Sequence, residues 1–177
     1  MATVPLTATG GRLTNYGKRM VAASMYAKGK YFLGAAMLLR INGGYEYVVL
    51  HLLCQGIEIT LKALLLFADY DAYKPKLRKY GRNGHDFSLT AIDALSAFCL
   101  SPLRSPLKEE LQALSSLYSR HLLRYGSFHD IIVDPQAITS QRVLRRMAAV
   151  LRLAERELLR MQSSNTALQG TPASGHP

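Results

Sequence analysis

Cysteine is scarce in this sequence: Cys54 and Cys99 are its two thiols, and they form neither a CxxC pair nor a metal-ligand spacing. This scarcity excludes a disulfide-dense scaffold and predicts a reduced, cytoplasmic setting. Charged residues interrupt the apolar stretches before they reach the ~18–20 residues that a membrane span needs, so no transmembrane helix is expected. Residues 1–11 lack the basic start and the long apolar core of a secretory signal.

Acidic residues are also few. The chain has 12 Asp and Glu against 22 Lys and Arg, which gives a formal net charge of +10, and no acidic residue precedes Glu46. Such an excess predicts a phosphate-bearing or otherwise anionic partner, although it says nothing about the fold. The length of 177 residues fits one domain, and a hydrophobic content of 49% excludes a chain that is disordered throughout.

Apolar residues recur at spacings of three and four, and no segment alternates with a period of two, so the sequence predicts an all-α protein. Helices are expected at about residues 14–39, 45–68, 86–101, 105–126 and 135–161. Short connections favour an antiparallel bundle of four or five helices over residues 13–162. A flexible N-terminus is expected at residues 1–12, and the Ser-, Thr-, Gly- and Pro-rich residues 163–177 predict a disordered tail.

The expected helix over residues 45–68 is apolar on most of its circumference, which favours a central position in the bundle. Its polar residues His51, Gln55, Glu58 and Lys62 form one narrow stripe. Glu58 and Lys62 stand in the favourable order for an i,i+4 ion pair. We expect this stripe to hold the bundle together, because a polar group buried without a partner is costly.

Most enzyme signatures are missing from the sequence. It contains no nucleophile elbow, phosphate-binding loop, HExxH, EF-hand or Rossmann pattern, and no carboxylate pair at a spacing typical of hydrolases. No cofactor and no metal are therefore expected. What remains is a set of histidine and arginine residues.

Two motifs carry a resemblance to a known family. Glu58 and Lys62 are followed, after a basic loop, by Gly84-His85-Asp86-Phe87. This arrangement resembles the HEPN family, the higher eukaryotes and prokaryotes nucleotide-binding domain, in which a Glu and a Lys on the second helix precede a Gly-His-Asp-Leu turn. The resemblance implies a helical bundle, frequent homodimerisation and association with RNA or nucleotides, often in toxin–antitoxin or defence systems.

Many catalytic members of that family carry an Arg followed by a His after four to six residues, and Arg124 and His129 have this spacing. RNA can be cleaved without a metal if His takes a proton from the 2′-hydroxyl and Arg stabilises the charge that develops on phosphorus. Gly126 allows the chain to turn so that the two side chains converge. Tyr125 departs from the polar residue that usually follows the Arg. The alternative interpretation is that Arg124 caps helical carbonyls and His129 is a surface residue.

Further basic residues extend the predicted binding surface. Arg120 and His121 precede Arg124 by one turn. The loop before the third helix carries five cations that could follow a phosphate backbone or remain solvated: Lys74, Lys76, Arg78, Lys79 and Arg82. Structural roles are expected for Glu58, Lys62, His85 and Asp86, with Asp86 as a helix N-cap. The last helix also has an excess of arginine.

These features lead to two hypotheses. The first is a HEPN-like protein that engages RNA or nucleotide phosphates and acts as a metal-independent endoribonuclease through Arg124 and His129. The alternative is a non-catalytic HEPN-like module that binds a nucleotide or a partner protein, such as a nucleotidyltransferase acting as its antitoxin.

Overall fold

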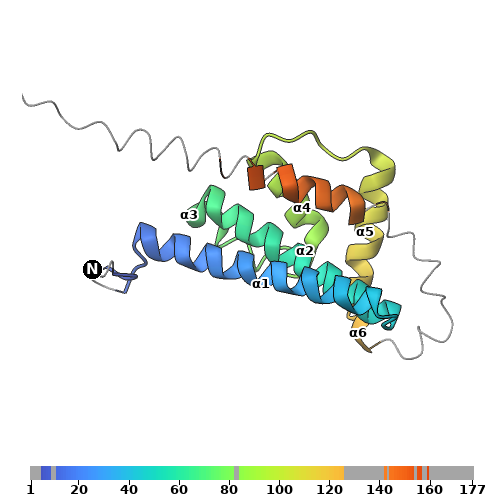
Figure 1. Cartoon of the computed structure of the whole chain (residues 1–177). Helices are drawn as coiled ribbons and strands as arrows, with labels where there is room; N and C mark the ends of the chain where they lie inside the picture. The colour runs from blue at the N-terminus through green and yellow to red at the C-terminus, as the bar shows by residue number, and fades with distance from the viewer. Residues whose placement is uncertain are drawn as a thin grey trace, which may run out of the picture.

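The computed structural model describes residues 5–8, 11–81, 84–125, 142, 144–153, 155–156 and 159, with the backbone alone at Arg124 and Tyr125. These residues are mostly helical and contain no β-strand, which confirms the all-α prediction. The named helices are α1 (Asn15–Ile41), α2 (Glu46–Ala68), α3 (Tyr70–Tyr73), α4 (Phe87–Ala97), α5 (Ser105–Ser119) and α6 (Leu122–Tyr125) (Figure 1). A further helical stretch, residues 144–153, is orange in Figure 1.

The start of α1 is held by a side-chain cap and by the residues before it. The Thr14 hydroxyl accepts a hydrogen bond from the Gly17 amide at 3.0 Å. The Thr14 amide in turn donates to the carbonyl of Leu6 at 3.0 Å, and Thr7 forms an isolated bridge with Leu13. Residues 5–8, which lie in the segment expected to be flexible, are thus hydrogen-bonded against the helix start. Residues 1–4 and the expected tail 163–177 lie outside the described residues.

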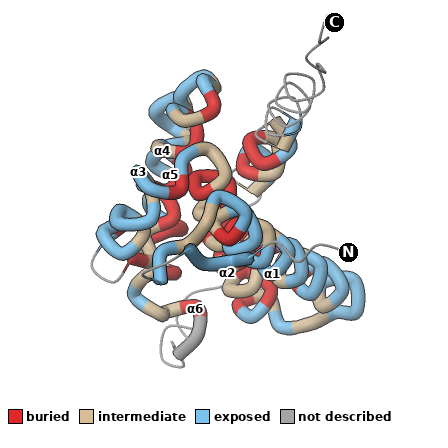
Figure 2. Tube along the Cα trace, turned by 90° about the vertical axis from the view of Figure 1, so that its left-hand side faces the viewer, coloured by how far each residue is buried: buried red, intermediate tan, exposed pale blue. Residues whose placement is uncertain are grey.

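The helix α2 occupies the centre of the protein, as its apolar circumference predicts. It packs against α1, α3, α4, α5 and α6, and the buried residues gather where these helices face one another (Figure 2). By length and composition alone, α2 is long and apolar enough to cross a membrane. Contrary to our expectation, its charged residues are too few to exclude this. However, 72% of the most apolar stretch of α2 is buried inside the protein, as is typical of the core helix of a bundle.

The helices α1 and α2 approach each other closely through small residues. A Cβ atom added at Gly29 of α1 would lie 2.3 Å from the Thr60 hydroxyl oxygen and 2.9 Å from the Thr60 amide nitrogen. A Cβ atom at Gly56 of α2 would lie 2.8 Å from the Leu33 side chain. Glycine at these two positions therefore sets the distance between the helices, at the expense of helix propensity.

The expected fourth helix is interrupted before Gly126. The helix α5 ends at Ser119, Arg120 is its C-cap, and His121 adopts a left-handed backbone conformation with φ of 60°. The chain then resumes as the four-residue helix α6. The prediction of a helix continuing to Gly126 was therefore wrong. The break turns α6 so that it packs against α2 as well as α5.

The helical stretch of residues 144–153 closes the core. Met147, Val150 and Leu151 are all buried in the main hydrophobic cluster. Glu155 accepts a hydrogen bond from the Tyr26 hydroxyl and pairs with Lys30 at 3.2 Å, which connects this stretch to α1. Burial, with the Glu155 carboxylate as the next cause, raises the pKa of Tyr26. The earlier part of the expected last helix, residues 135–141, lies outside the described residues.

Candidate functional site

A buried carboxylate lies at the centre of the candidate site. Glu58 on α2 is 4% exposed, and its Oε1 atom accepts a hydrogen bond from the Lys62 ammonium at 2.5 Å. Its Oε2 atom accepts a hydrogen bond from the Tyr118 hydroxyl on α5 at 2.7 Å. The Lys62 ammonium also donates to the carbonyl of Gly84. These contacts provide the partners that a buried ion pair needs, and they join α2, α5 and the turn before α4.

His85 extends from this carboxylate to the surface. Its Nδ1 atom lies 3.2 Å from Glu58 Oε1 and 3.4 Å from Oε2, while 45% of the side chain is exposed. A carboxylate beside Nδ1 favours the tautomer that carries its hydrogen there. In the neutral ring the Nε2 atom is then left as a proton acceptor, which is the arrangement that a general base requires.

His121 lies beside His85 because of the break between α5 and α6. Its amide donates to the Tyr118 carbonyl at 3.0 Å, and its left-handed backbone separates the end of α5 from the start of α6. The two imidazole rings are 6.3 Å apart between centroids. Tyr118 contacts both His85 and His51, with ring centroids at 6.4 Å and 5.5 Å. We refer to His51, His85, Tyr118 and His121 with Glu58 as the histidine cluster.

Asp86 fixes the turn that carries His85. It is the N-cap of α4, and its carboxylate accepts hydrogen bonds from the amides of Ser88 and Leu89. The Ser115 hydroxyl on α5 also donates to it, at 2.8 Å. Burial by itself raises the pKa of Asp86, but the hydrogen bonds from Ser88, Ser115 and Leu89 outweigh burial, so the net pKa is lowered. Capping thus orients His85 by anchoring its neighbour to two helices.

The residues predicted to be catalytic are only partly within the described structure. Arg120 is exposed at the end of α5, next to the histidine cluster. The backbone of Arg124 lies in α6, which begins directly after His121 and packs on α2. The Arg124 side chain and the whole of His129 lie outside the described residues.

The basic loop reaches the cluster at its C-terminal end. Lys74 and Lys76 are exposed and lie over the rings of Tyr70 and Tyr73, with ammonium-to-centroid distances of 5.1 Å and 4.9 Å. Arg78 and Lys79 are also exposed. A Cβ atom at Gly84, whose φ is 76°, would lie 3.3 Å from the Arg78 Cα, so the Arg78 backbone runs beside the turn that carries His85. Arg82 lies outside the described residues.

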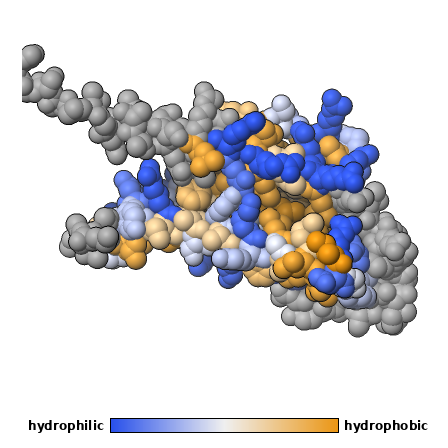
Figure 3. All heavy atoms as spheres, viewed as in Figure 1, coloured by the Kyte–Doolittle hydropathy of each residue, from blue (hydrophilic) through white to orange (hydrophobic). Residues whose placement is uncertain are grey.

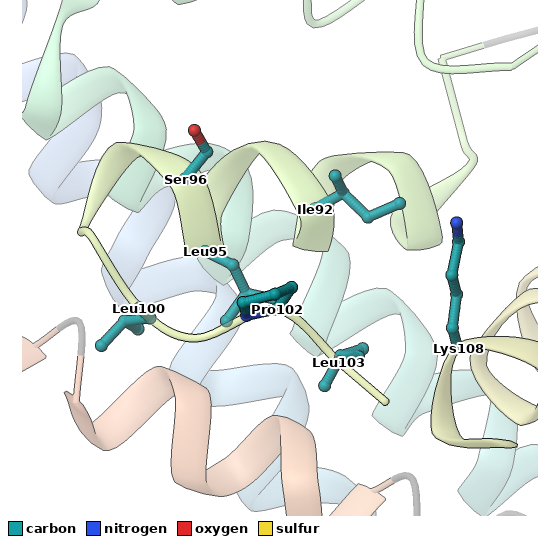
Figure 4. Close-up of a pocket in the computed structure, with 7 residues that line it drawn as sticks. All are labelled: Ile92, Leu95, Ser96, Leu100, Pro102, Leu103 and Lys108. Atoms are coloured by element: carbon teal, nitrogen blue, oxygen red, sulfur yellow. The ribbon is translucent and has the colours of Figure 1, made fainter. Parts of the chain in front are cut away.

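An apolar pocket of about 380 Å³ separates α4 from the chain that connects it to α5. Figure 4 shows Ile92 and Leu95 coming from α4, Leu100, Pro102 and Leu103 from the connection, and Lys108 from α5. Lys108 is the one charged residue that lines it, so the pocket offers no acid–base pair. Chemistry is therefore better assigned to the histidine cluster.

No group of three or more His, Cys, Asp or Glu among the described residues could hold a metal ion. Cys54 is buried, and burial together with the charge of Glu58 raises the pKa of its thiol, so this cysteine is a weak nucleophile. Near the buried Glu58 carboxylate, the groups that could contact a ligand include the imidazoles of His85 and His121 and the exposed Arg120.

The chain matches no protein-family model, no curated protein and no solved structure. The resemblance to the HEPN family thus rests on the quoted motifs and stays a prediction.

Sequence reasoning missed two members of the cluster as site residues. The periodicity places Tyr118 on the core side of its helix, but a buried tyrosine hydroxyl needs a partner, and this requirement was the available signal. His51 shares the stripe of Glu58 and Lys62, yet nothing in the sequence indicates that its ring meets Tyr118, because the two are far apart along the chain.

Proposed function

We propose that this chain engages RNA or nucleotide phosphates at the histidine cluster and cleaves RNA without a metal. The observation that supports this proposal best is the Glu58–His85 pair with His121 beside it. A buried carboxylate orients one imidazole, 45% of that side chain is exposed, and a second imidazole lies 6.3 Å away between centroids. The net charge of +10 favours association with a polyanion.

The proposed reaction needs one base and one acid. The Nε2 atom of His85 takes the proton of the 2′-hydroxyl, and the 2′-oxygen forms a bond to phosphorus. The bond from phosphorus to the 5′-oxygen breaks, and that oxygen takes a proton from the His121 imidazolium. The products are a 2′,3′-cyclic phosphate and a 5′-hydroxyl, and the protons balance between the two histidines.

Arg124 and His129 have a place in the same proposal. The helix α6 follows His121 directly, so the Arg124 guanidinium is proposed to stabilise the charge that develops on the phosphate oxygens. His129 is the alternative base or acid that the family resemblance implies. The two assignments differ in which imidazole variants lose activity.

The test is incubation of the pure protein with single-stranded RNA in EDTA. We expect cleavage to fall at least ~100-fold in His85→Asn and His121→Asn, since general acid–base catalysis contributes ~10²–10⁴-fold. Asparagine is chosen at residue 121 because it tolerates the left-handed backbone. Arg40→Gln, an exposed charge on α1, is the matched control and should cleave normally.

Cleavage that persists in His85→Asn and His121→Asn but is lost in His129→Ala would overturn the assignment to His85 and His121. It would favour Arg124 and His129 instead. Cleavage that is unchanged in all four variants, Arg124→Ala included, would contradict the proposed nuclease altogether.

The second proposed function is a non-catalytic module that binds a nucleotide or a protein such as a nucleotidyltransferase. Tyr125 supports it, because a bulky aromatic replaces the polar residue expected after Arg124. This function predicts RNA or nucleotide binding with no cleavage, or a stable stoichiometric complex with a co-expressed partner on gel filtration.

We further propose a cytoplasmic homodimer whose helices form an antiparallel bundle. Large apolar side chains are exposed near the junction of α1 and α2: Leu38 is 65%, Ile41 76% and Tyr45 55% exposed. An exposed apolar patch of this kind supports a protein interface. Light scattering should give twice the chain mass for the wild type and a single chain mass for Ile41→Glu; a monomeric wild type contradicts the dimer.

A further inference from the structure

The helix α1 has two apolar faces, of which one packs on α2 and the other is exposed. The inner face buries Ala22 and Gly29. A second stripe runs along the opposite side of the helix, because its members recur at spacings of three and four residues. This stripe consists of Tyr16, Met20, Ala23, Ala27 and Tyr31. We call it the outer face of α1.

Large side chains of the outer face are open to solvent. Tyr16 and Met20 are each 45% exposed, and Tyr31 is 80% exposed. The helix lies along one edge of the protein in Figure 1, and its outer side is pale blue in Figure 2. An exposed apolar stripe along a 27-residue helix indicates a surface that contacts a protein or a membrane.

The charged residues beside the outer face are all positive. With 3.6 residues per turn, Arg19 and Lys30 flank the stripe on one side, and Lys28 flanks it on the other. The whole of α1 contains no Asp or Glu. An anionic membrane attracts such cations, each of which strengthens binding by about fivefold, and tyrosine favours the boundary between membrane and water. The charge pattern is therefore complementary to an anionic lipid surface.

A second copy of this chain fits the outer face less well. Two copies paired along it would bring Arg19, Lys28 and Lys30 of both chains together with no acidic residue of α1 between them, and like charges repel. The patch assigned above to the homodimer differs, because Glu46 directly follows Tyr45 there. Figure 3 shows hydrophobic residues gathered where α1 meets α2, at the lower right of the view. Charge thus separates this patch from the outer face.

We propose that the outer face of α1 docks on an anionic membrane surface. The helix lies parallel to the membrane, and the side chains of Tyr16, Met20 and Tyr31 enter the headgroup region. Arg19 and Lys28 contact negatively charged headgroups on the two sides of the stripe. No member of the histidine cluster takes part, so the proposal does not depend on RNA cleavage or on binding at that cluster.

The test is cosedimentation of the full chain with vesicles of phosphatidylcholine alone and with vesicles of equal parts phosphatidylserine and phosphatidylcholine. We expect binding to the mixed vesicles only, and weaker binding at high salt. Met20→Gln/Tyr31→Gln and Arg19→Gln/Lys28→Gln should each weaken this binding at least ~10-fold, because they remove apolar contact and charge, respectively. All four residues are exposed, so the melting temperature should not fall.

The matched controls remove the same kinds of group elsewhere. Leu89→Gln/Ile92→Gln replaces two exposed apolar side chains of α4, and Arg104→Gln/Lys108→Gln removes two exposed cations at the start of α5. Both variants should bind the mixed vesicles as the wild type does.

Three outcomes would overturn the proposal. The first is a wild type that binds neither kind of vesicle. The second is an equal loss of binding in Arg19→Gln/Lys28→Gln and Arg104→Gln/Lys108→Gln, which would mean attraction by net charge alone. The third is a Met20→Gln/Tyr31→Gln variant that still binds vesicles but turns from dimer to monomer in light scattering, which would assign the outer face to a second copy of this chain.

Discussion

The buried Glu58–Lys62 pair can be removed one partner at a time or as a whole, and the two kinds of change should differ sharply. Glu58→Met leaves the Lys62 ammonium, whose side chain is 11% exposed, without its carboxylate. Lys62→Met leaves the Glu58 carboxylate, whose side chain is 5% exposed, without its ammonium. The double variant leaves neither charge. Methionine is suitable because it fills a similar volume and adapts to irregular cavities.

Each single substitution should lower the free energy of unfolding by ~3–5 kcal/mol, since it strands a charge inside the protein. If the two effects were independent, the double variant would lose roughly 6–10 kcal/mol, which is comparable to the whole stability of a typical domain. We expect the double variant to lose only ~1–3 kcal/mol, mainly because the buried Tyr118 hydroxyl loses its acceptor.

The assay is urea unfolding at pH 7, followed by circular dichroism, on the wild type, both single variants and the double variant. The exposed pair Lys18–Asp71 is the control, with an expected coupling below ~1 kcal/mol. Single variants that lose less than ~1 kcal/mol each, or a double variant that loses the sum of both, would refute the account of Glu58 as the buried centre of the site.

Two further predictions concern the scaffold of the site. Gly29→Ala should destabilise the protein despite a gain of ~1 kcal/mol in helix propensity, because the new Cβ would lie 2.9 Å from the Thr60 amide nitrogen. Gly34→Ala should stabilise the protein, because nothing lies within 4 Å of its new Cβ. Thermal unfolding of both variants tests this, and equal shifts in melting temperature would contradict the close packing of α1 on α2. Asp86→Asn should make stability depend less on pH in the acid range. The lowered pKa of Asp86 stabilises the fold above the ordinary pKa of ~3.9, and this stabilisation is lost as the pH falls through the folded pKa. Urea midpoints between pH 5 and pH 2 should therefore fall less in the variant than in the wild type, and equal slopes would contradict the role of the Ser88 and Ser115 hydrogen bonds.

The sequence predicted best those features that depend on neighbouring residues. The central position of α2 follows from its apolar circumference, and the Glu58–Lys62 pair follows from a spacing of four. The N-cap at Asp86 is equally local. Such contacts lie within one helical turn, so periodicity and capping chemistry suffice to predict them.

Features that join distant segments could not be predicted in the same way. Tyr118 reaches Glu58 across 60 positions, and Tyr26 reaches Glu155 across 129 positions. The helix breaks at His121 although no glycine or proline lies there. The break could not be predicted from local propensity, because it depends on the tertiary packing of α6 on α2.

The proposed function depends above all on the binding of RNA phosphates by His85 and His121. The most direct measurement is an NMR titration of the imidazole carbon-bound protons of the full chain with a 2′-O-methylated RNA oligonucleotide, which lacks the 2′-hydroxyl and cannot be cleaved by the proposed route. His85→Asn and His121→Asn assign the two signals. We expect both signals to shift together and to saturate at the same RNA concentration, with a midpoint that rises steeply with salt. Saturation of RNA binding with both signals unmoved would contradict it.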